Sequence, residues 1–293
     1  MRKGDEVRCV WEAGCELGEG PVWDARTETL YFVDIKGDAV LAYNDRTGGS
    51  SSLFPGSPSA IVPLIDEEAL LCASVRGLER FWPENGRREQ VGSIDLEPPG
   101  NRTNDGKCDP AGRFWVGTMD DAEQSYSGTL YCFDAVASAR AVITNIGVSN
   151  GLDWSPDGAS FYYTDSLRRT IWHFPFDVAT GELGLRRVFA LVPKETGAPD
   201  GLAVDAEGFV WSAHWDGWRV TRYAPDGRID RIIRLPVPRP TSVSFGGNGF
   251  ETLFITSARI GLATETLDQA ASSGALFACE PGVRGRPPSL ARI

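Results

Sequence analysis

Six short apolar segments of the chain are each preceded by a polar residue whose side chain offers an oxygen atom. These residues recur at intervals of 40 to 50 positions and are Glu19, Ser59, Asn104, Asn150, Asp200 and Thr241. Carboxylate, carboxamide and hydroxyl oxygens are ligands that divalent cations such as Ca²⁺, Mg²⁺ and Mn²⁺ prefer. If the fold brings these positions together, they would form a metal-binding ring.

The repeated unit around each polar residue is typical of a β-hairpin followed by further strands. In the clearest copy, Asn150 and a glycine precede a short apolar strand, a Ser-Pro-Asp-Gly turn and a second strand that ends at Asp165. Proline fixes φ at the second turn position and glycine accepts positive φ, so the turn has a physical basis. A third strand follows in most units and a fourth is plausible, for example at 170–174 and 186–189. Four-stranded units at this spacing are typical of β-propeller blades.

We therefore predict an all-β fold, a six-bladed β-propeller with four-stranded blades, as a single domain over residues 1–293. The first strand, at about Val7 to Trp11, should pair with the last blade, because closing the ring removes a free sheet edge. The nearest candidate for a helix is the short segment 264–271. A β-sandwich or two all-β domains are the alternatives, but neither has a reason to repeat at this period.

In a propeller the innermost strand of each blade lines a central channel, so the six aligned residues should form a ring at one channel mouth. The competing interpretation is that these side chains are simply solvated in a wet channel. Asp200 also lies in a Pro-Asp-Gly sequence, which the chain uses as an ordinary turn at Pro156 and Pro225. Those two turns link strands within a blade, whereas Asp200 precedes an inner strand in register with Asn150. The register therefore favours the metal ring.

Two further segments should lie near the same mouth. Arg102 and Asn104 are two residues apart and share a side of an extended chain, so Arg102 can donate to a substrate oxygen. A surface arginine is the alternative. The loop 119–128 is longer than a tight hairpin needs, so it can fold over the mouth and present Asp120 or Asp121 to sugar hydroxyls. A solvated acidic loop is the competing interpretation.

Other chemistries find less support. The two histidines, His173 and His214, fall in different units, which argues against a Ser-His-Asp relay or a His-rich zinc site. Cys108 lies in an inner strand without an evident base, and no two of the six cysteines have C-x-x-C spacing. The phosphate-binding motifs G-x-x-x-x-G-K-[ST] and, between strand and helix, G-x-G-x-x-G do not occur, so nucleotide-dependent chemistry is not indicated.

Composition narrows the range of partners. The net charge of −11 repels phosphate backbones, so we expect no nucleic-acid partner. No stretch approaches the roughly 20 apolar residues of a membrane span, and the N-terminal residues lack the apolar run of a signal peptide. We therefore expect a cytoplasmic protein with no membrane partner, and the sequence leaves its oligomeric state open.

Seven phrases distributed along nearly the whole chain match, in order, the motifs of one known family. They are L-G-E-G-P-V-W (17–23), R-T-N-D-G-K-C-D-P-A-G-R-F-W-V-G-T-M (102–119), S-N-G-L-D-W-S (149–155), F-Y-Y-T-D-S (161–166), P-D-G-L-A-V-D-A-E-G (199–208), S-F-G-G (244–247) and T-S-A-R-I-G-L (256–262). The chain thus resembles the regucalcin (senescence marker protein) and gluconolactonase family of sugar lactonases. The resemblance implies a six-bladed propeller with one divalent metal ion in its channel.

The resemblance also implies roles for individual residues. It places the metal ligands on Glu19, Asn150 and Asp200. It places substrate contacts on Arg102 and Asn104. The family's acidic lid residue corresponds best to Asp121, although the lid here reads Asp-Asp-Ala rather than a run ending in two glutamates. That departure bears on substrate preference more than on the chemistry.

These features together predict metal-dependent hydrolysis of a sugar (aldono-) lactone to the aldonic acid. The metal ion, for which Ca²⁺, Zn²⁺, Mn²⁺, Mg²⁺ and Fe(II) are all open, would polarise the ester carbonyl and activate water. Asp200 is the candidate base for the water proton, while Arg102 and Asn104 would orient the sugar. Two alternatives remain: a metal-dependent hydrolase of phosphotriesters or aryl esters, which would want an apolar mouth, and a propeller that binds a divalent cation without catalysis.

Overall fold

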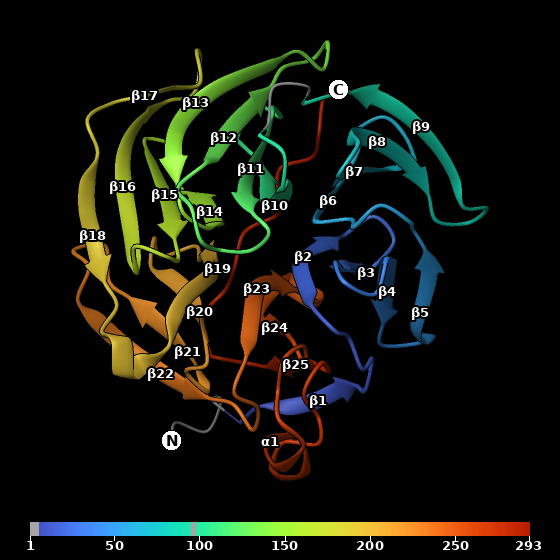
Figure 1. The fold of residues 1–293 in the computed structure, drawn as a ribbon, viewed down its shortest axis with the longest axis vertical. Coiled ribbons are helices and arrows are strands. Elements are labelled where there is room, and N and C mark those ends of the chain that lie inside the picture. Colours follow the sequence, from blue (N-terminus) through green and yellow to red (C-terminus); the bar gives the residue numbers. More distant parts are fainter. Residues whose placement is uncertain (1–5, 95–97) are drawn as a thin grey trace.

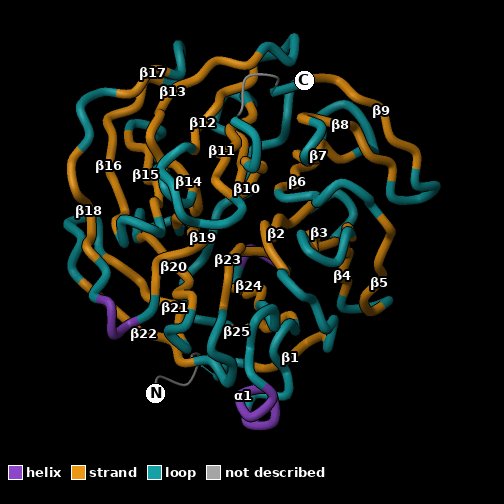
Figure 2. The backbone as a smooth tube through the Cα atoms, viewed as in Figure 1, coloured by secondary structure: helices purple, strands orange, loops and turns teal. Residues whose placement is uncertain are grey.

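Six antiparallel sheets are arranged in a ring around a central channel (Figure 1). The computed structural model describes residues 6–94 and 98–293. Strands and loops make up nearly all of this chain, and the short helix α1 (Thr264–Gln269) lies at the rim of the ring, close to where the sequence predicted a helix (Figure 2). The prediction of an all-β, six-bladed β-propeller is confirmed.

Blades one to three are consecutive hairpins that run from the channel outward. Their strands are β2 (Gly18–Asp24), β3 (Thr29–Asp34), β4 (Ala39–Asn44) and β5 (Gly48–Leu53); β6 (Ala60–Pro63), β7 (Leu70–Ser74), β8 (Gly77–Trp82) and β9 (Arg87–Gly92); and β10 (Asn101–Cys108), β11 (Phe114–Asp120), β12 (Gly128–Phe133) and β13 (Ala139–Ile146). The inner strands β2, β6 and β10 therefore begin near the predicted ring positions.

Blades four to six repeat this order with two additions. Their strands are β14 (Ser149–Trp154), β15 (Ser160–Asp165), β16 (Thr170–Asp177), β17 (Glu182–Leu183) and β18 (Arg187–Leu191); β19 (Ala198–Val204), β20 (Val210–Trp215), β21 (Arg219–Tyr223) and β22 (Ile229–Arg234); and β23 (Pro240–Gly246), β24 (Thr252–Ser257), β25 (Leu276–Cys279) and β1 (Arg8–Trp11). Short 3₁₀ turns occur at Lys194–Thr196 and Asn248–Phe250.

The two additions concern the outer edges. In blade six, β1 pairs with β25 and places Cys9 opposite Phe277, so the two ends of the propeller close the ring as predicted. In blade four, the long strand β16 pairs with β18 over its first half and with β17 at Phe176 and Asp177. The outer position of this blade is therefore shared by two short strands, where the sequence predicted one.

Aromatic side chains fill the spaces between neighbouring blades. The ring centroids of Trp115 in blade three and Trp154 in blade four lie 5.8 Å apart in an edge-on arrangement. Phe161 lies 4.9 Å from Trp154, and all three side chains are fully buried. Burying a side chain of the size of Phe161 stabilises a fold by about 2–3 kcal/mol. Packing of this density holds the inner strands, and hence any site built on them, in fixed positions.

A buried aspartate fixes the turn after the inner strand in blades three and five. Asp109 and Asp205 each accept backbone N–H groups of the turn through Oδ1. Through Oδ2 each accepts the indole N–H of a tryptophan six residues later, Trp115 at 3.0 Å and Trp211 at 2.9 Å. The repeated Asp-x-x-Gly turns thus anchor both the backbone and an inter-blade aromatic ring.

The fold contains no disulfide bond among the six cysteines and no membrane-spanning helix among the described residues. All six cysteines are free thiols, and five of them are buried. In the part of the chain that the structure describes, no helix is both long and apolar enough to cross a membrane.

Candidate metal centre at the channel mouth

In five of the six blades, a β-bulge interrupts the inner strand at the register of the predicted polar ring. The pairing with the second strand shifts at Glu19–Val22, Thr103–Gly106, Asn150–Leu152, Pro199–Leu202 and Pro240–Val243. A bulge places an extra residue in one strand and changes the direction of the side chains beside it. The same local distortion is therefore repeated around the channel mouth.

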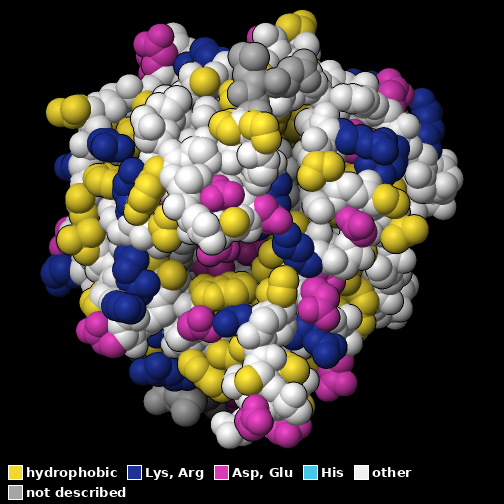
Figure 3. Space-filling model, in the orientation of Figure 1, with side chains coloured by type: hydrophobic (Ala, Val, Ile, Leu, Met, Phe, Trp, Pro, Cys, Tyr) yellow, Lys and Arg dark blue, Asp and Glu magenta, His cyan; other side chains and the backbone are white. Residues whose placement is uncertain are grey.

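Four members of the predicted ring meet in one pocket. Glu19, Asn104, Asn150 and Asp200 all line a pocket of about 230 Å³ and are all buried. Figure 3 shows a hollow at the centre of the ring, with acidic side chains on its wall. The convergence that the register predicted is present for these four residues.

Ser59 and Thr241 do not line this pocket, so the expectation of a six-membered ring is corrected to four. The Ser59 hydroxyl donates to Thr103 Oγ1 at 2.8 Å, which links blades two and three. The Thr241 hydroxyl donates to the carbonyl of Gly18 and so links blades six and one. Short hydroxyl side chains at these two positions bond the adjacent inner strand instead of reaching the channel.

Hydrogen bonds fix the two carboxamides. Asn104 Nδ2 donates to Asn150 Oδ1 at 3.0 Å and to the Ser149 carbonyl at 2.7 Å. Asn150 Nδ2 donates to Ser166 Oγ at 3.0 Å. Arg102 Nη1 donates to Asn104 Oδ1 at 2.6 Å, so the predicted proximity of Arg102 and Asn104 is found. Asn150 keeps a free lone pair on Oδ1, because a carbonyl oxygen accepts two bonds.

Glu19 and Asp200 are two of the three carboxylates that line the pocket, and in the part of the chain that the structure describes neither forms an ion pair with a basic side chain. Asp200 Oδ1 is buried without any hydrogen-bond partner, and Glu19 Oε2 accepts the N–H of Gly20 at 3.1 Å. Burial, followed by the charge of Glu19, raises the pKa of Asp200 well above its usual range. Burial and the charge of Asp105 likewise raise the pKa of Glu19. Buried like charges are costly unless a cation compensates them, so this donor set fits a divalent ion.

The candidate centre depends on a carboxamide as well as on the carboxylates. Among residues 6–94 and 98–293, no group of three or more His, Cys, Asp and Glu side chains could hold a metal ion. Asn150 supplies the third oxygen donor beside Glu19 and Asp200. An all-oxygen set of this kind suits hard cations better than a thiolate or imidazole site would.

The loop between β11 and β12 reaches the mouth from blade three. Asp120 accepts the N–H groups of Ala122, Gln124 and Ser125 and so folds the loop itself. Asp121 instead accepts both Lys36 Nζ, at 2.8 Å and 2.9 Å, and the Arg102 guanidinium. Burial opposes ionisation of Asp121, but these two cations outweigh it and lower its pKa.

Asp121 itself does not line the pocket, whereas Glu123 of the same loop does. Glu123 has a left-handed backbone with φ of 56°, and its charge contributes to raising the pKa of Asp200. Neither Glu123 nor Lys36 was among the residues predicted from the sequence to lie at the mouth. Lys36 lies in a turn of blade one, 85 residues from Asp121, and nothing in the sequence signals that contact.

The remaining wall of the pocket is apolar in part. The apolar lining residues are Leu17, Met119, Val148, Leu167, Ala198 and Trp215. The mouth therefore combines a polar floor with an apolar wall.

The histidines and Cys108 do not line this pocket. His214 Nδ1 bonds the Thr196 carbonyl at 2.9 Å, and burial lowers the pKa of His214 to about 4. His173 Nε2 bonds Ser160 Oγ at 2.9 Å. Burial raises the pKa of the Cys108 thiol well above its usual range, which makes a reactive thiolate unfavourable.

Comparison with known proteins places this architecture in a family. Residues 17–259 match the family model described as the SMP-30/gluconolactonase/LRE-like region. The chain belongs to this family. Regucalcin of Gallus gallus is 34% identical over 291 residues and regucalcin of Danio rerio is 35% identical over 288 residues, and each match covers 97% of both chains. The predicted family resemblance is therefore confirmed.

Solved structures of similar proteins share the whole architecture. Regucalcin of Agrobacterium tumefaciens, described as a calcium-binding protein, is 29% identical, with a TM-score of 0.94 over 98% of both chains. A luciferin-regenerating enzyme is 28% identical, with a TM-score of 0.92 over 98% of this chain and 99% of that one. Membership of the SMP-30/gluconolactonase/LRE-like family is thus supported at the level of both sequence and fold.

Proposed function

We propose that this protein hydrolyses a sugar lactone to the sugar acid at a divalent metal centre held by Glu19, Asn150 and Asp200. The observation that carries the proposal is the buried pair of carboxylates at the pocket floor, in which Asp200 Oδ1 has no partner. Membership of a family named after gluconolactonase supports the reaction type, and a calcium-binding relative supports the metal.

The residues of the pocket divide the chemistry among them. A divalent ion bound there would polarise the lactone carbonyl and lower the pKa of attacking water. Asp200 presents a carboxylate oxygen without a competing hydrogen bond, so it can accept the proton of that water. Asn104 accepts a hydrogen bond from Arg102 and donates one to Asn150. It therefore holds Arg102, which would contact the substrate, in a fixed position relative to Asn150, which would bind the metal ion.

Arg102 is the candidate for orienting the sugar. Its Nε is bound to Asp121 and its Nη1 to Asn104, which holds the guanidinium in one orientation beside the pocket. A positioned donor lowers the entropic cost of bringing the lactone carbonyl to the reacting atoms. The predicted role of Asp121 as a substrate contact stays a prediction. Its contacts to Arg102 and Lys36 favour a supporting role instead.

Two alternatives remain, and each has an observation in its favour. The apolar wall that includes Leu167 and Trp215 would suit an aryl ester or a phosphotriester better than an all-polar mouth would. The calcium-binding description of the Agrobacterium relative is also consistent with metal binding without catalysis. The dense hydrogen bonding around Arg102 and Asn104 is our reason to place the sugar lactone first.

The test is acid release in a pH-indicator assay with metal-stripped protein, to which Ca²⁺, Mn²⁺, Mg²⁺, Zn²⁺ or Fe(II) is restored. Substrates are five- and six-membered aldonolactones, an aryl ester and a phosphotriester, each corrected for spontaneous hydrolysis. We expect metal-dependent turnover of a lactone and its loss in Asp200→Ala. Turnover of only the aryl ester or the phosphotriester would show a hydrolase of those esters instead of a lactonase. Metal binding without turnover of any substrate would contradict catalysis.

A further inference from the structure

The C-terminal segment that follows β25 crosses the channel at the end opposite the mouth. Its backbone bonds four blades in succession: Arg284 to Ala206, Gly285 to Phe250, Ala291 to Pro63 and Ile65, and Arg292 to Gly112. Arg286 adds a side-chain bond to blade four, because its Nη2 donates to the Trp154 carbonyl at 2.6 Å. Five of the six blades are therefore joined by this one segment.

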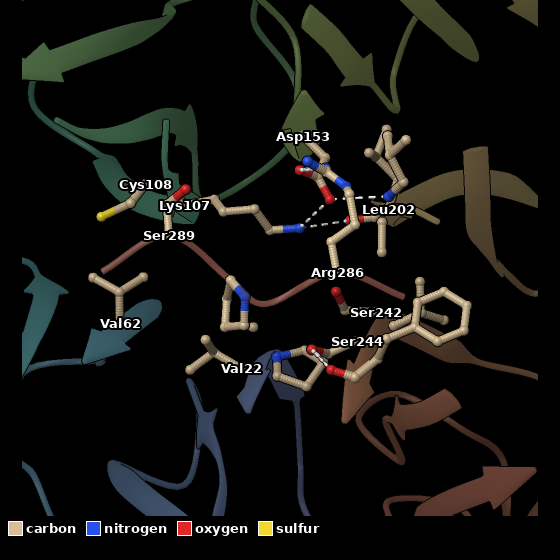
Figure 4. A pocket seen from close by; sticks show the side chains of 18 of the residues that line it. Val22, Val62, Lys107, Cys108, Asp153, Leu202, Ser242, Ser244, Arg286 and Ser289 are labelled. Carbon is tan, nitrogen blue, oxygen red and sulfur yellow. Dashed lines mark hydrogen bonds and ion pairs between the residues drawn. The ribbon is translucent and has the colours of Figure 1, made fainter. Parts of the chain in front are cut away.

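A cavity of about 60 Å³ lies between this segment and the metal centre. Its lining includes residues that lie one to four positions beyond the site residues on the same inner strands: Gly20–Val22, Asp105–Cys108, Asp153–Trp154 and Leu202–Val204. Figure 4 shows Lys107 pointing across this cavity toward Asp153 and Leu202, with the C-terminal segment passing between Arg286 and Ser289.

Lys107 connects three inner strands at this level. Its Nζ donates to Asp153 Oδ2 at 3.2 Å and to the Leu202 carbonyl at 3.1 Å. Asp153 Oδ2 also accepts the N–H of Val204 at 2.9 Å, while Asp153 Oδ1 lies 3.4 Å from Arg286 Nη2. One ammonium group and one carboxylate thus hold β10, β14 and β19 together.

These three strands are the ones that carry Asn104, Asn150 and Asp200. Lys107 and Asp153 each lie three residues beyond their site residue, or about 10 Å along an extended strand. Between the two levels each strand contains its bulge, where regular ladder bonds are missing. The contacts of Lys107 and Asp153, which lie beyond the bulges, can therefore determine how far apart β10, β14 and β19 are held at the site.

We propose that Lys107 and Arg286, acting through Asp153, are positioning residues that hold Asn104, Asn150 and Asp200 at the separation needed to bind the metal ion. The C-terminal segment is then a functional part of the site, because it supplies Arg286. This inference rests on the proposed metal centre. Groups that orient metal ligands from outside the coordination shell typically change metal affinity by about 10- to 100-fold.

The test is calorimetric titration of metal-stripped protein with Ca²⁺ alone, for the wild type, Lys107→Met, Arg286→Met and the double variant. We expect a Kd about 10- to 100-fold weaker for Lys107→Met. We expect a smaller loss for Arg286→Met, because its contact to Asp153 is the longer one. The double variant should lose less than the product of the two single effects, since both act through Asp153.

Lys107→Arg keeps the charge and two donors, so it should recover most of the affinity. Arg284→Met is the matched control, because this neighbouring side chain pairs with Glu251 at the exposed surface. Partial unfolding alone would also lower kcat at an unchanged KM, so kcat at saturating Ca²⁺ is expressed per folded protein, with the folded fraction taken from circular dichroism. On that basis kcat of Lys107→Met should stay reduced while KM for the lactone changes little.

The outcomes separate the two proposals. If the wild type binds Ca²⁺ and both single variants bind it with unchanged Kd, the positioning role is wrong and the metal centre stands. If the wild type binds neither Ca²⁺ nor, in repeat titrations, Mn²⁺, Mg²⁺, Zn²⁺ or Fe(II), the proposed function itself fails, and this inference fails with it. Should Lys107→Met not fold, the comparison of Arg286→Met with Arg284→Met decides the question alone.

Discussion

Asp200→Asn should make the metal-free protein more stable while it abolishes metal binding. The wild-type carboxylate is buried, has an oxygen without a hydrogen-bond partner and lies close enough to Glu19 for the charge of Glu19 to disfavour ionisation of Asp200. Replacing it with a neutral carboxamide of the same shape removes the buried negative charge and its repulsion with Glu19, which we expect to stabilise the fold by about 1–3 kcal/mol. For 293 residues the unfolding entropy is about 0.6 kcal/mol per degree, so Tm should rise by about 2–5 °C.

The assay is thermal unfolding of both proteins, first in chelator and then with increasing Ca²⁺. At a Ca²⁺ concentration of about 100 times Kd, binding stabilises the wild type by about 2.7 kcal/mol, so its Tm should rise by about 4 °C while the variant stays unchanged. A variant that is less stable than the wild type in chelator would refute the argument that Asp200 is held in an unfavourable environment. Equal stabilisation of both proteins by Ca²⁺ would refute its role as a ligand.

Three other predictions follow from contacts in the structure. Lys36→Met should change the free energy of unfolding by less than about 1 kcal/mol, because its pair with Asp121 is partly exposed, yet raise KM for the lactone several-fold; an unchanged KM would contradict the supporting role of Asp121. His214 should cost the wild type about 3 kcal/mol of stability as the pH falls from 6.5 toward 4, because the pKa of His214 is lowered to about 4 in the fold and is about 6.5 in the unfolded chain. The raised pKa values of Glu19 and Asp200 change stability in the opposite direction, so the quantity to measure is the difference between wild type and His214→Gln in urea unfolding over this range, and parallel curves would argue against the His214 contribution. Asp205→Ala should destabilise the protein by about 2–4 kcal/mol in urea unfolding, since it removes the carboxylate that pairs with the buried Arg222, and a loss below 1 kcal/mol would contradict that account.

The blades could be predicted because their signals are local. A Ser-Pro-Asp-Gly turn specifies a hairpin by the backbone preferences of its own residues, and the copy that begins at Asn150 pairs as those residues indicate. Ring closure by β1 could be predicted because a free edge strand is unfavourable. The division of the outer edge of blade four between β17 and β18 could not, since Glu182–Leu183 is too short to carry a strand pattern.

The sequence register predicts which residues occupy equivalent positions at the channel mouth, but not which of them line the pocket. Asn104 and Ser59 occupy equivalent positions, but Asn104 lies at a bulge and lines the pocket, whereas Ser59 precedes a regular strand and bonds Thr103. Side-chain length and bulge geometry decide between these outcomes, and the repeat pattern encodes neither. The contacts of Lys36 and Arg286 could not be predicted for another reason. Each residue reaches the site region from a distant part of the chain, Lys36 through Asp121 and Arg286 through Asp153.

The central claim is that Glu19, Asn150 and Asp200 hold one divalent ion at the channel mouth. The most direct measurement is an anomalous difference map from crystals of the protein grown with Ca²⁺. We expect one strong peak at the pocket floor, with oxygens of these three side chains at about 2.3–2.6 Å. A peak bound by other residues, or no peak in crystals of protein shown to bind Ca²⁺ in solution, would contradict the claim.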